Sequence, residues 1–153
     1  MVIETNVARW TVIKILIDTG SFADILFASS FDNMKLDRNL LQPAGNPLYG
    51  FGRKKVNAIR KIPLPVYVED QQNCRTEYIT FDVVEIQYPY NAIFGRGVTN
   101  TFSAILHPWY LCKKLPVAKG IIAIFGNQYS TRAAEGIAAP GQRNVDNLQS
   151  RSA

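Results

Sequence analysis

One short segment has the residue types for chemistry: an acidic side chain followed by a tight turn, Asp18-Thr19-Gly20-Ser21. The run before it, Ile15–Ile17, is aliphatic, and a carboxylate at the end of such a run is unfavourable unless a partner or a reaction uses it. Gly20 lets the backbone turn tightly, and Thr19 and Ser21 place hydroxyl groups beside the carboxylate. A carboxylate held in this way could act as a general acid or base. The same residues also suit an ordinary turn at a strand end.

Two further segments follow in the sequence. Leu48–Gly52 contains two glycines and predicts a hairpin that could fold over a cleft, and Ala92–Arg96 places two large apolar residues before Gly95 and Arg96. Each has a plain explanation, because any β-hairpin accounts for the first and a buried strand for the second. Their order after Asp18 is what makes the combination informative.

With these segments, the sequence resembles the retropepsin-like aspartic proteases, in particular those of plant gypsy-type LTR retrotransposon polyproteins. The resemblance covers about residues 2 to 130 and includes, besides the Asp18 segment, the strings Ala23–Phe27, Pro47–Phe51 and Pro89–Arg96. It implies an all-β fold: a closed barrel equivalent to one lobe of an acid protease, with one or two short helices and a flexible C-terminal tail.

The resemblance also implies roles for individual residues. Asp18 would be catalytic, the hydroxyl of Thr19 would bond across a dimer axis, and Ser21 would bond the outer carboxylate oxygen. Separately, because both residues lie beside segments that this fold would bring together, Arg96 is predicted to pair with Asp24 in support of the loop; the alternative is a surface Arg96 and a solvated Asp24. The whole predicted site consists of the catalytic Asp18, the loop support Thr19, Gly20, Ser21, Asp24, Ile93, Phe94, Gly95 and Arg96, and the substrate-binding flap Tyr49, Gly50, Phe51 and Gly52.

Peptide hydrolysis by this class needs two carboxylates about 3 Å apart that share one proton. The chain has a single Asp-Thr-Gly and no internal repeat, so the second aspartate is predicted to come from a second copy in a homodimer. The predicted substrate is a polypeptide, the gag-pol polyprotein. The hairpin Tyr110–Phe125 is the candidate dimer surface, since an exposed terminal hairpin can pair with its twofold mate.

Composition narrows the alternatives. The chain has 153 residues, enough for one domain, with 47% apolar residues and a net charge of +5. The basic residues are scattered in pairs, such as Lys113 and Lys114, so they are expected to be solvated surface and direct nucleic-acid binding is not expected. Cys74 and Cys112 lack further ligands at metal-site spacing, so neither a metal nor a cofactor is expected.

The distribution of β-branched and turn-forming residues predicts the elements. Residues 1–126 are predicted to form the protease domain, and 127–153, poor in large apolar residues, a flexible tail or linker. Pro63 and Pro65 predict that their strand lies at a sheet edge. The predicted strands are Trp10–Ile17, Ile62–Val68, Tyr78–Ile86 and Asn91–Phe94, the hairpins are Leu48–Val56 and Tyr110–Val117 with Gly120–Phe125, and helical turns lie within Phe31–Leu41 and Val98–Ile105.

Neither a signal peptide nor an apolar run of roughly 20 residues is visible. No membrane association is therefore expected, and the expected location is the cytoplasm or virus-like particles within it. The chain is expected to be a fragment of a longer polyprotein.

Two positions depart from the resemblance, because Arg53 in the flap and Arg60 after it stand where related proteins usually have glycine. Arg53 lacks the φ freedom of glycine and would stiffen the flap tip. An alternative is therefore an inactive retropepsin-fold remnant that acts as a dimeric interaction module or has no function. Two others are a purely structural β-domain and an actin-like phosphate loop at Ile17–Ser21, which would need a second phosphate loop and a longer chain.

Overall fold

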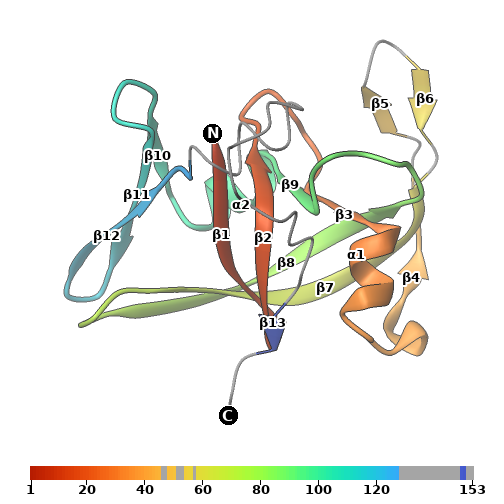
Figure 1. Cartoon of the computed structure of the whole chain (residues 1–153), viewed down its shortest axis with the longest axis horizontal. Helices are drawn as coiled ribbons and strands as arrows, with labels where there is room; N and C mark the ends of the chain where they lie inside the picture. The colour runs from red at the N-terminus through yellow and green to blue at the C-terminus, as the bar shows by residue number, and fades with distance from the viewer. Residues whose placement is uncertain (46–47, 51–53, 57, 128–148, 151–153) are drawn as a thin grey trace, which may run out of the picture.

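The computed structural model of the chain describes residues 1–45, 48–50, 54–56, 58–127 and 149–150. Most of it is β-structure, with two short α-helices (Figure 1). The elements, in chain order, are β1 (Val2–Val7), β2 (Trp10–Ile17), β3 (Ile25–Phe27), α1 (Ala28–Asn33), the 3₁₀ helix η1 (Arg38–Leu40), β4 (Gln42–Pro43), β5 (Leu48–Gly50), β6 (Lys54–Val56), β7 (Ala58–Glu69), β8 (Cys74–Val84), β9 (Ala92–Phe94), α2 (Arg96–Thr101), β10 (Ile105–His107), β11 (Cys112–Val117), β12 (Gly120–Phe125) and β13 (Gln149–Ser150).

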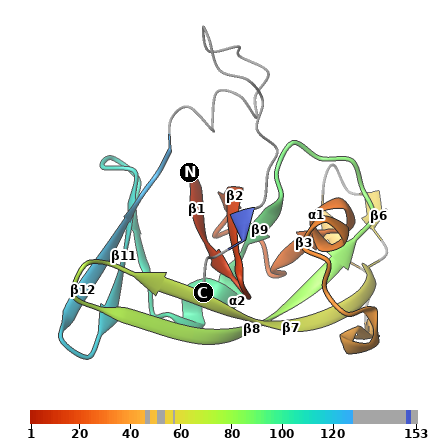
Figure 2. The ribbon, with the colours of Figure 1, turned by 60° about the horizontal axis from the view of Figure 1, so that its bottom comes forward.

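Within the described part of the chain, six strands close into a ring in the order β1-β2-β9-β3-β8-β7 and back to β1 (Figure 2). The β2–β9 and β3–β8 pairs are parallel, and the other pairs are antiparallel. The closure is short, because β1 and β7 are paired at two positions, Asn6 with Tyr67 and Val7 with Val66. The prediction of a closed all-β barrel with one or two short helices is confirmed.

The interior of the barrel is filled by side chains that alternate along the strands. In β7, Ile62, Leu64, Val66 and Val68 are buried, and residues between them face outward, as expected for a strand with one face on a core. Pro63 and Pro65 belong to the outward set. One edge of β7 pairs with β8 along its length, while the other pairs only with short stretches of β4 and β1. Pro63 lies between those two stretches, and Pro65, which has no N–H to donate, accepts a hydrogen bond from Ala8 N–H at 2.8 Å just after β1.

Several element boundaries differ from the prediction. The β7–β8 hairpin is longer than expected, because β8 begins at Cys74 and the connector shrinks to a tight turn. That turn is held by Asp70, whose carboxylate accepts hydrogen bonds from the backbone of Gln72 at 2.8 Å and Asn73 at 2.7 Å. Helix α2 begins at Arg96, directly after β9, earlier than the helical turns expected from residue 98. Strand β10 is an element that the sequence patterns do not predict.

The C-terminal hairpin β11–β12 is present where the sequence predicts it, and β10 adds a third strand to it. This small sheet stands at one end of the barrel (Figure 1). The predicted tail lies outside the described residues, apart from Asn127 and the two residues of β13, which pair with Trp10 and Thr11 of β2. In the described ranges, no helix is long and apolar enough to cross a bilayer.

Candidate active site

Asp18 is the first residue after β2, and its side chain is exposed to solvent. Its backbone N–H donates to the carbonyl of Phe94 at 3.0 Å, which continues the parallel β2–β9 pairing by one residue. The N–H of Gly20 donates to Asp18 Oδ1 at 3.0 Å, and the N–H of Ser21 donates to the Asp18 carbonyl at 3.1 Å. The turn therefore presents the carboxylate outward and orients it with the amide of Gly20.

The loop of residues 18–24 lies directly on the end of β9. A Cβ at Gly95 would stand 2.7 Å from the carbonyl oxygen of Ser21 and would overlap that of Ala23, so only glycine fits there. The next backbone N–H, that of Arg96, donates to the Ser21 carbonyl at 2.9 Å. The predicted segment Ile93-Phe94-Gly95 thus contacts the loop that bears Asp18 through backbone atoms.

Asp24, at the end of this loop, is buried and binds backbone amides of the neighbouring segment. Its side chain is 6% exposed, and Oδ1 accepts hydrogen bonds from Gly95 N at 2.8 Å and Val98 N at 3.2 Å. Burial raises the pKa of this carboxyl above its usual 3.8, although these two N–H groups and the charge of Lys113 act in the opposite direction. A Cβ at Gly97 would overlap the other carboxylate oxygen. Asp24 therefore ties the loop that bears Asp18 to the first turn of α2.

The predicted pairing of Arg96 with Asp24 is wrong. Arg96 Nε donates to the carbonyl of Thr19 at 3.1 Å, and its guanidinium carbon lies 4.2 Å from the ring centroid of Phe22. The physical reason is that the Asp24 carboxylate points inward to buried amides, whereas the Arg96 side chain crosses the exposed side of the loop. Asp24 therefore belongs to the buried side of the loop, and Arg96 binds its exposed side.

The predicted bond from Ser21 to the catalytic carboxylate is also absent within the described chain. Ser21 Oγ donates instead to the carbonyl of Ala23 at 2.9 Å. The hydroxyl bond of Thr19 across a dimer axis involves a second copy and stays a prediction.

The predicted flap hairpin is formed by β5 and β6, with Leu48 opposite Val56, Tyr49 opposite Lys55 and Gly50 opposite Lys54. In Figure 1 it stands at the upper end of the barrel, as does the turn that follows β2. Phe51, Gly52 and the departure at Arg53 lie outside the described residues. Arg60, the second departure, is exposed on β7 and is paired with Pro43 of β4.

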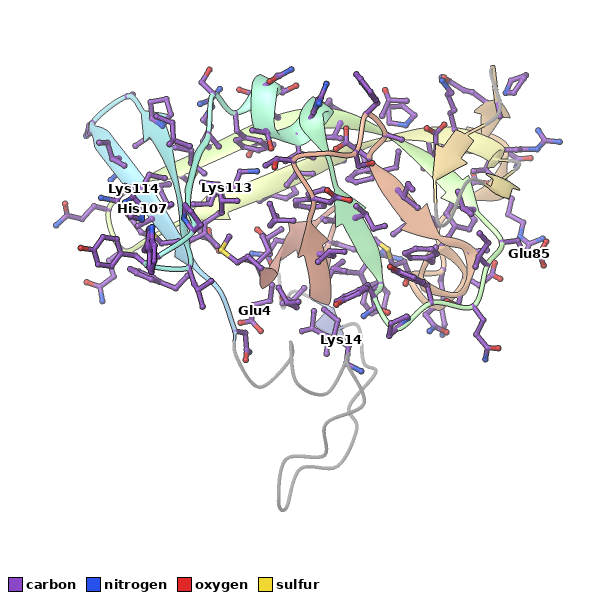
Figure 3. All side chains as sticks on the ribbon, turned by 90° about the horizontal axis from the view of Figure 1, so that it is seen from above. Glu4, Lys14, Glu85, His107, Lys113 and Lys114 are labelled. Carbon is purple, nitrogen blue, oxygen red and sulfur yellow. The ribbon has the colours of Figure 1, made fainter. Side chains whose placement is uncertain are left out.

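Sequence reasoning missed Lys113, which it placed on the surface. Lys113 is 3% exposed and its Nζ donates to Thr99 Oγ1 at 2.8 Å, while its neighbour Lys114 is exposed (Figure 3). The signal in the sequence is the alternation of the strand, because Lys113 shares a face with the apolar Leu115. Residue type points the other way, since lysines are almost never fully buried.

In the part of the chain that the structure describes, no group of three or more His, Cys, Asp or Glu side chains could hold a metal ion. Cys112 is buried, Cys74 is exposed, and both are free thiols. The ring of His107 packs on Tyr110 at a centroid distance of 4.5 Å, away from the Asp18 loop in sequence and in element. Asp18 is therefore the group around which this site is built.

No family model and no curated protein matches the sequence. Among solved structures, the chain is similar to the retroviral protease-like domain of Ddi1 from Leishmania major, with a TM-score of 0.54 over 82% of this chain and 91% of that one. The chain has the retropepsin-like fold. The identity between the two sequences is 13%, so the likeness concerns the retropepsin-like fold alone.

Proposed function

We propose that the chain is an aspartic endopeptidase, acting within an LTR retrotransposon polyprotein of the plant gypsy type, in which two copies each supply one Asp18. The observation that carries this proposal is an exposed carboxylate, Asp18, on a turn braced by the backbone of Gly95 at the end of a parallel strand pair of the retropepsin-like fold. An outward-facing carboxylate oriented by the amide of Gly20 is suited to meet a reacting water and a second carboxylate.

The proposed reaction uses the two carboxylates unequally. Two such groups about 3 Å apart cannot both be ionised near neutral pH, so they share one proton. The ionised group removes a proton from a water molecule held between them, and the water oxygen attacks the scissile carbonyl carbon. The protonated group meanwhile donates its proton to the carbonyl oxygen. Proton transfer to the amide nitrogen then lets the C–N bond break, giving a carboxylic acid and an amine.

The second aspartate is proposed to come from another copy, because the sequence holds one Asp-Thr-Gly triplet. The small sheet of β10, β11 and β12, called the hairpin sheet below, offers a surface for that contact. Its outer face and the adjoining turn expose large apolar side chains at between 64% and 91%, a pattern associated with interaction sites. They are Ile105, Trp109, Tyr110, Ile121 and Phe125.

The test is cleavage of a gag-derived polypeptide by concentrated protein at mildly acidic pH, with and without pepstatin. The wild type is expected to cleave, pepstatin to inhibit, and Asp18→Asn to abolish cleavage. Asp37→Asn is the matched control, because Asp37 is also an exposed aspartate. Its carboxylate accepts a hydrogen bond from Asn39 N–H, and the amide oxygen of an asparagine can accept the same bond. Cleavage that survives Asp18→Asn contradicts the proposal. Complete absence of cleavage by the wild-type dimer would favour the inactive remnant.

A further inference from the structure

A buried ammonium group lies under the first turn of α2. Lys113 projects from β11, and its side chain lines a small apolar cavity together with Ile17, Phe94 and Val98. An isolated charge in such surroundings is strongly unfavourable. Its Nζ donates a hydrogen bond to Thr99 Oγ1 at 2.8 Å, so the residue is committed to this position rather than reaching solvent.

The hydrogen bonds continue from Lys113 to the end of β9. The hydroxyl of Thr99 donates to the Gly95 carbonyl at 3.0 Å, and the N–H of the same Gly95 donates to Asp24 Oδ1 at 2.8 Å. One peptide segment is thus held on its carbonyl side by a chain leading to an ammonium and on its amide side by a carboxylate. That segment is the one on which Ser21 and Ala23 rest.

We propose that Lys113 is a positioning residue for the Asp18 loop: its ammonium compensates the buried carboxylate of Asp24 and, through Thr99, holds Gly95 in place. The C-terminal hairpin is then part of the catalytic unit, because β11 supplies a charge that the loop 18–24 depends on. The catalytic consequence rests on the proposed function, whereas the coupling between Lys113 and Asp24 does not.

The surrounding charges agree with this arrangement. Asp24 and Lys113 attract each other, which lowers the pKa of Asp24 and raises that of Lys113 against the larger opposing effect of burial. Asp82 on β8 repels Asp24 and is itself 3.9 Å from Lys61 of β7. Arg96 of α2 is bound to Thr19 on the outer side. Among the described residues, Lys113 is therefore the cation whose charge acts on Asp24 from inside the fold.

The coupling can be measured by a double-mutant cycle on amide hydrogen exchange. Wild type, Lys113→Met, Asp24→Asn and the double variant would be compared at pH 7 through the protection of the Gly95 and Val98 amides. An amide oxygen at position 24 can still accept these N–H groups, but it carries no charge to compensate. The double variant is expected to lose at least about tenfold less protection than the two single losses multiplied together predict. A matched cycle with Lys114→Met, at the exposed neighbour, is expected to show no coupling.

Two readouts separate a charge effect from simple packing. First, the coupling is expected to shrink as the pH falls towards 4, because Asp24 becomes protonated. Second, Lys113→Gln keeps a hydrogen-bond donor for Thr99 but removes the charge, and it is expected to behave as Lys113→Met does. Lys113→Gln also replaces Lys113→Met if the latter does not fold. Independent effects of the two substitutions at pH 7, or an equal coupling at Lys114, would overturn the proposal. If the wild type proves inactive as a protease, the cycle still measures the coupling between the two charges; if it is active, the same coupling is expected in kcat and not in KM.

Discussion

Gly95 and Ser21 are in such close contact that a single added carbon at position 95 would stand 2.7 Å from the Ser21 carbonyl oxygen. This contact sets the distance between the end of β9 and the loop that bears Asp18. A Cβ would also overlap the Ala23 carbonyl, and both obstacles are backbone atoms that cannot rotate away. The position of the carboxylate is therefore fixed by backbone packing, with side chains adding to it.

Gly95→Ala is expected to lower the free energy of unfolding by about 2–3 kcal/mol, because the loop must move to admit the methyl group. Cleavage activity should fall with it, since a displaced Asp18 no longer meets its twin. Urea unfolding and a peptide-cleavage assay measure the two effects. Gly45→Ala is the control, as its Cβ would meet nothing nearer than Lys61 Nζ at 3.9 Å. Equal stability of the two variants would show that the loop is not held by this contact.

Arg75 joins β8 to α2 and β11, since its guanidinium donates to the carbonyls of Thr101, Phe102 and Pro116 at 2.8–2.9 Å. Arg75→Lys keeps the charge, but a lysine lacks the planar guanidinium that reaches three carbonyls at once. We expect it to destabilise the fold by about 1–3 kcal/mol. Arg38→Lys, at an exposed ion pair, should change stability by less than about 1 kcal/mol. Thermal unfolding compares the two variants. Unchanged stability of Arg75→Lys would show that these three hydrogen bonds do not hold the elements together.

Lys113 gives the stability an alkaline pH dependence of known sign. Burial lowers its pKa from 10.5 to about 8, so between these values the unfolded chain binds the proton that the folded chain has released. Stability contributed by this group therefore rises as the pH increases from about 8 towards 10.5. Over this pH range the free energy of unfolding of the wild type should rise relative to that of Lys113→Met by up to about 3 kcal/mol. Parallel stability–pH curves for the two proteins would contradict the burial of this ammonium.

The exposed apolar face of the hairpin sheet is expected to be buried against a second copy. The double substitution Ile121→Lys and Phe125→Lys should raise the dimer dissociation constant by at least about a hundredfold, because two charges would enter an apolar contact. Sedimentation equilibrium measures it. Tyr78→Lys changes a residue of similar exposure, 72%, on β8 and should leave the dimer intact. Unchanged association of the hairpin variant would place the interface elsewhere.

The barrel is predictable from the sequence because strand periodicity reports which residues face a core. Two such local patterns are the alternation of Ile62, Leu64, Val66 and Val68 and the apolar run that ends at Asp18. Both segments are strands in the structure, β7 and β2. Periodicity does not report which distant groups meet. The closure of β1 on β7 rests on two paired positions, Asn6 with Tyr67 and Val7 with Val66, and no local sequence pattern marks it.

The errors at the site have the same origin. A pairing of Arg96 with Asp24 is the natural expectation for opposite charges beside adjoining segments. The backbone amides of Gly95 and Val98 bind the carboxylate instead, since a buried acceptor must satisfy buried donors first. Residue type alone places Lys113 on the surface, although its place in the alternation of β11 indicates the inward face.

The most direct measurement of the central claim is the activity of mixed dimers. Wild-type and Asp18→Asn chains would be mixed in equal amounts, equilibrated well above the dissociation constant and assayed at fixed total protein. If each active site needs two Asp18 carboxylates, only the dimers with two wild-type chains, about a quarter of the total, should cleave. Activity that remains at about half would mean that each chain works with its own carboxylate, and the shared-aspartate mechanism would be wrong.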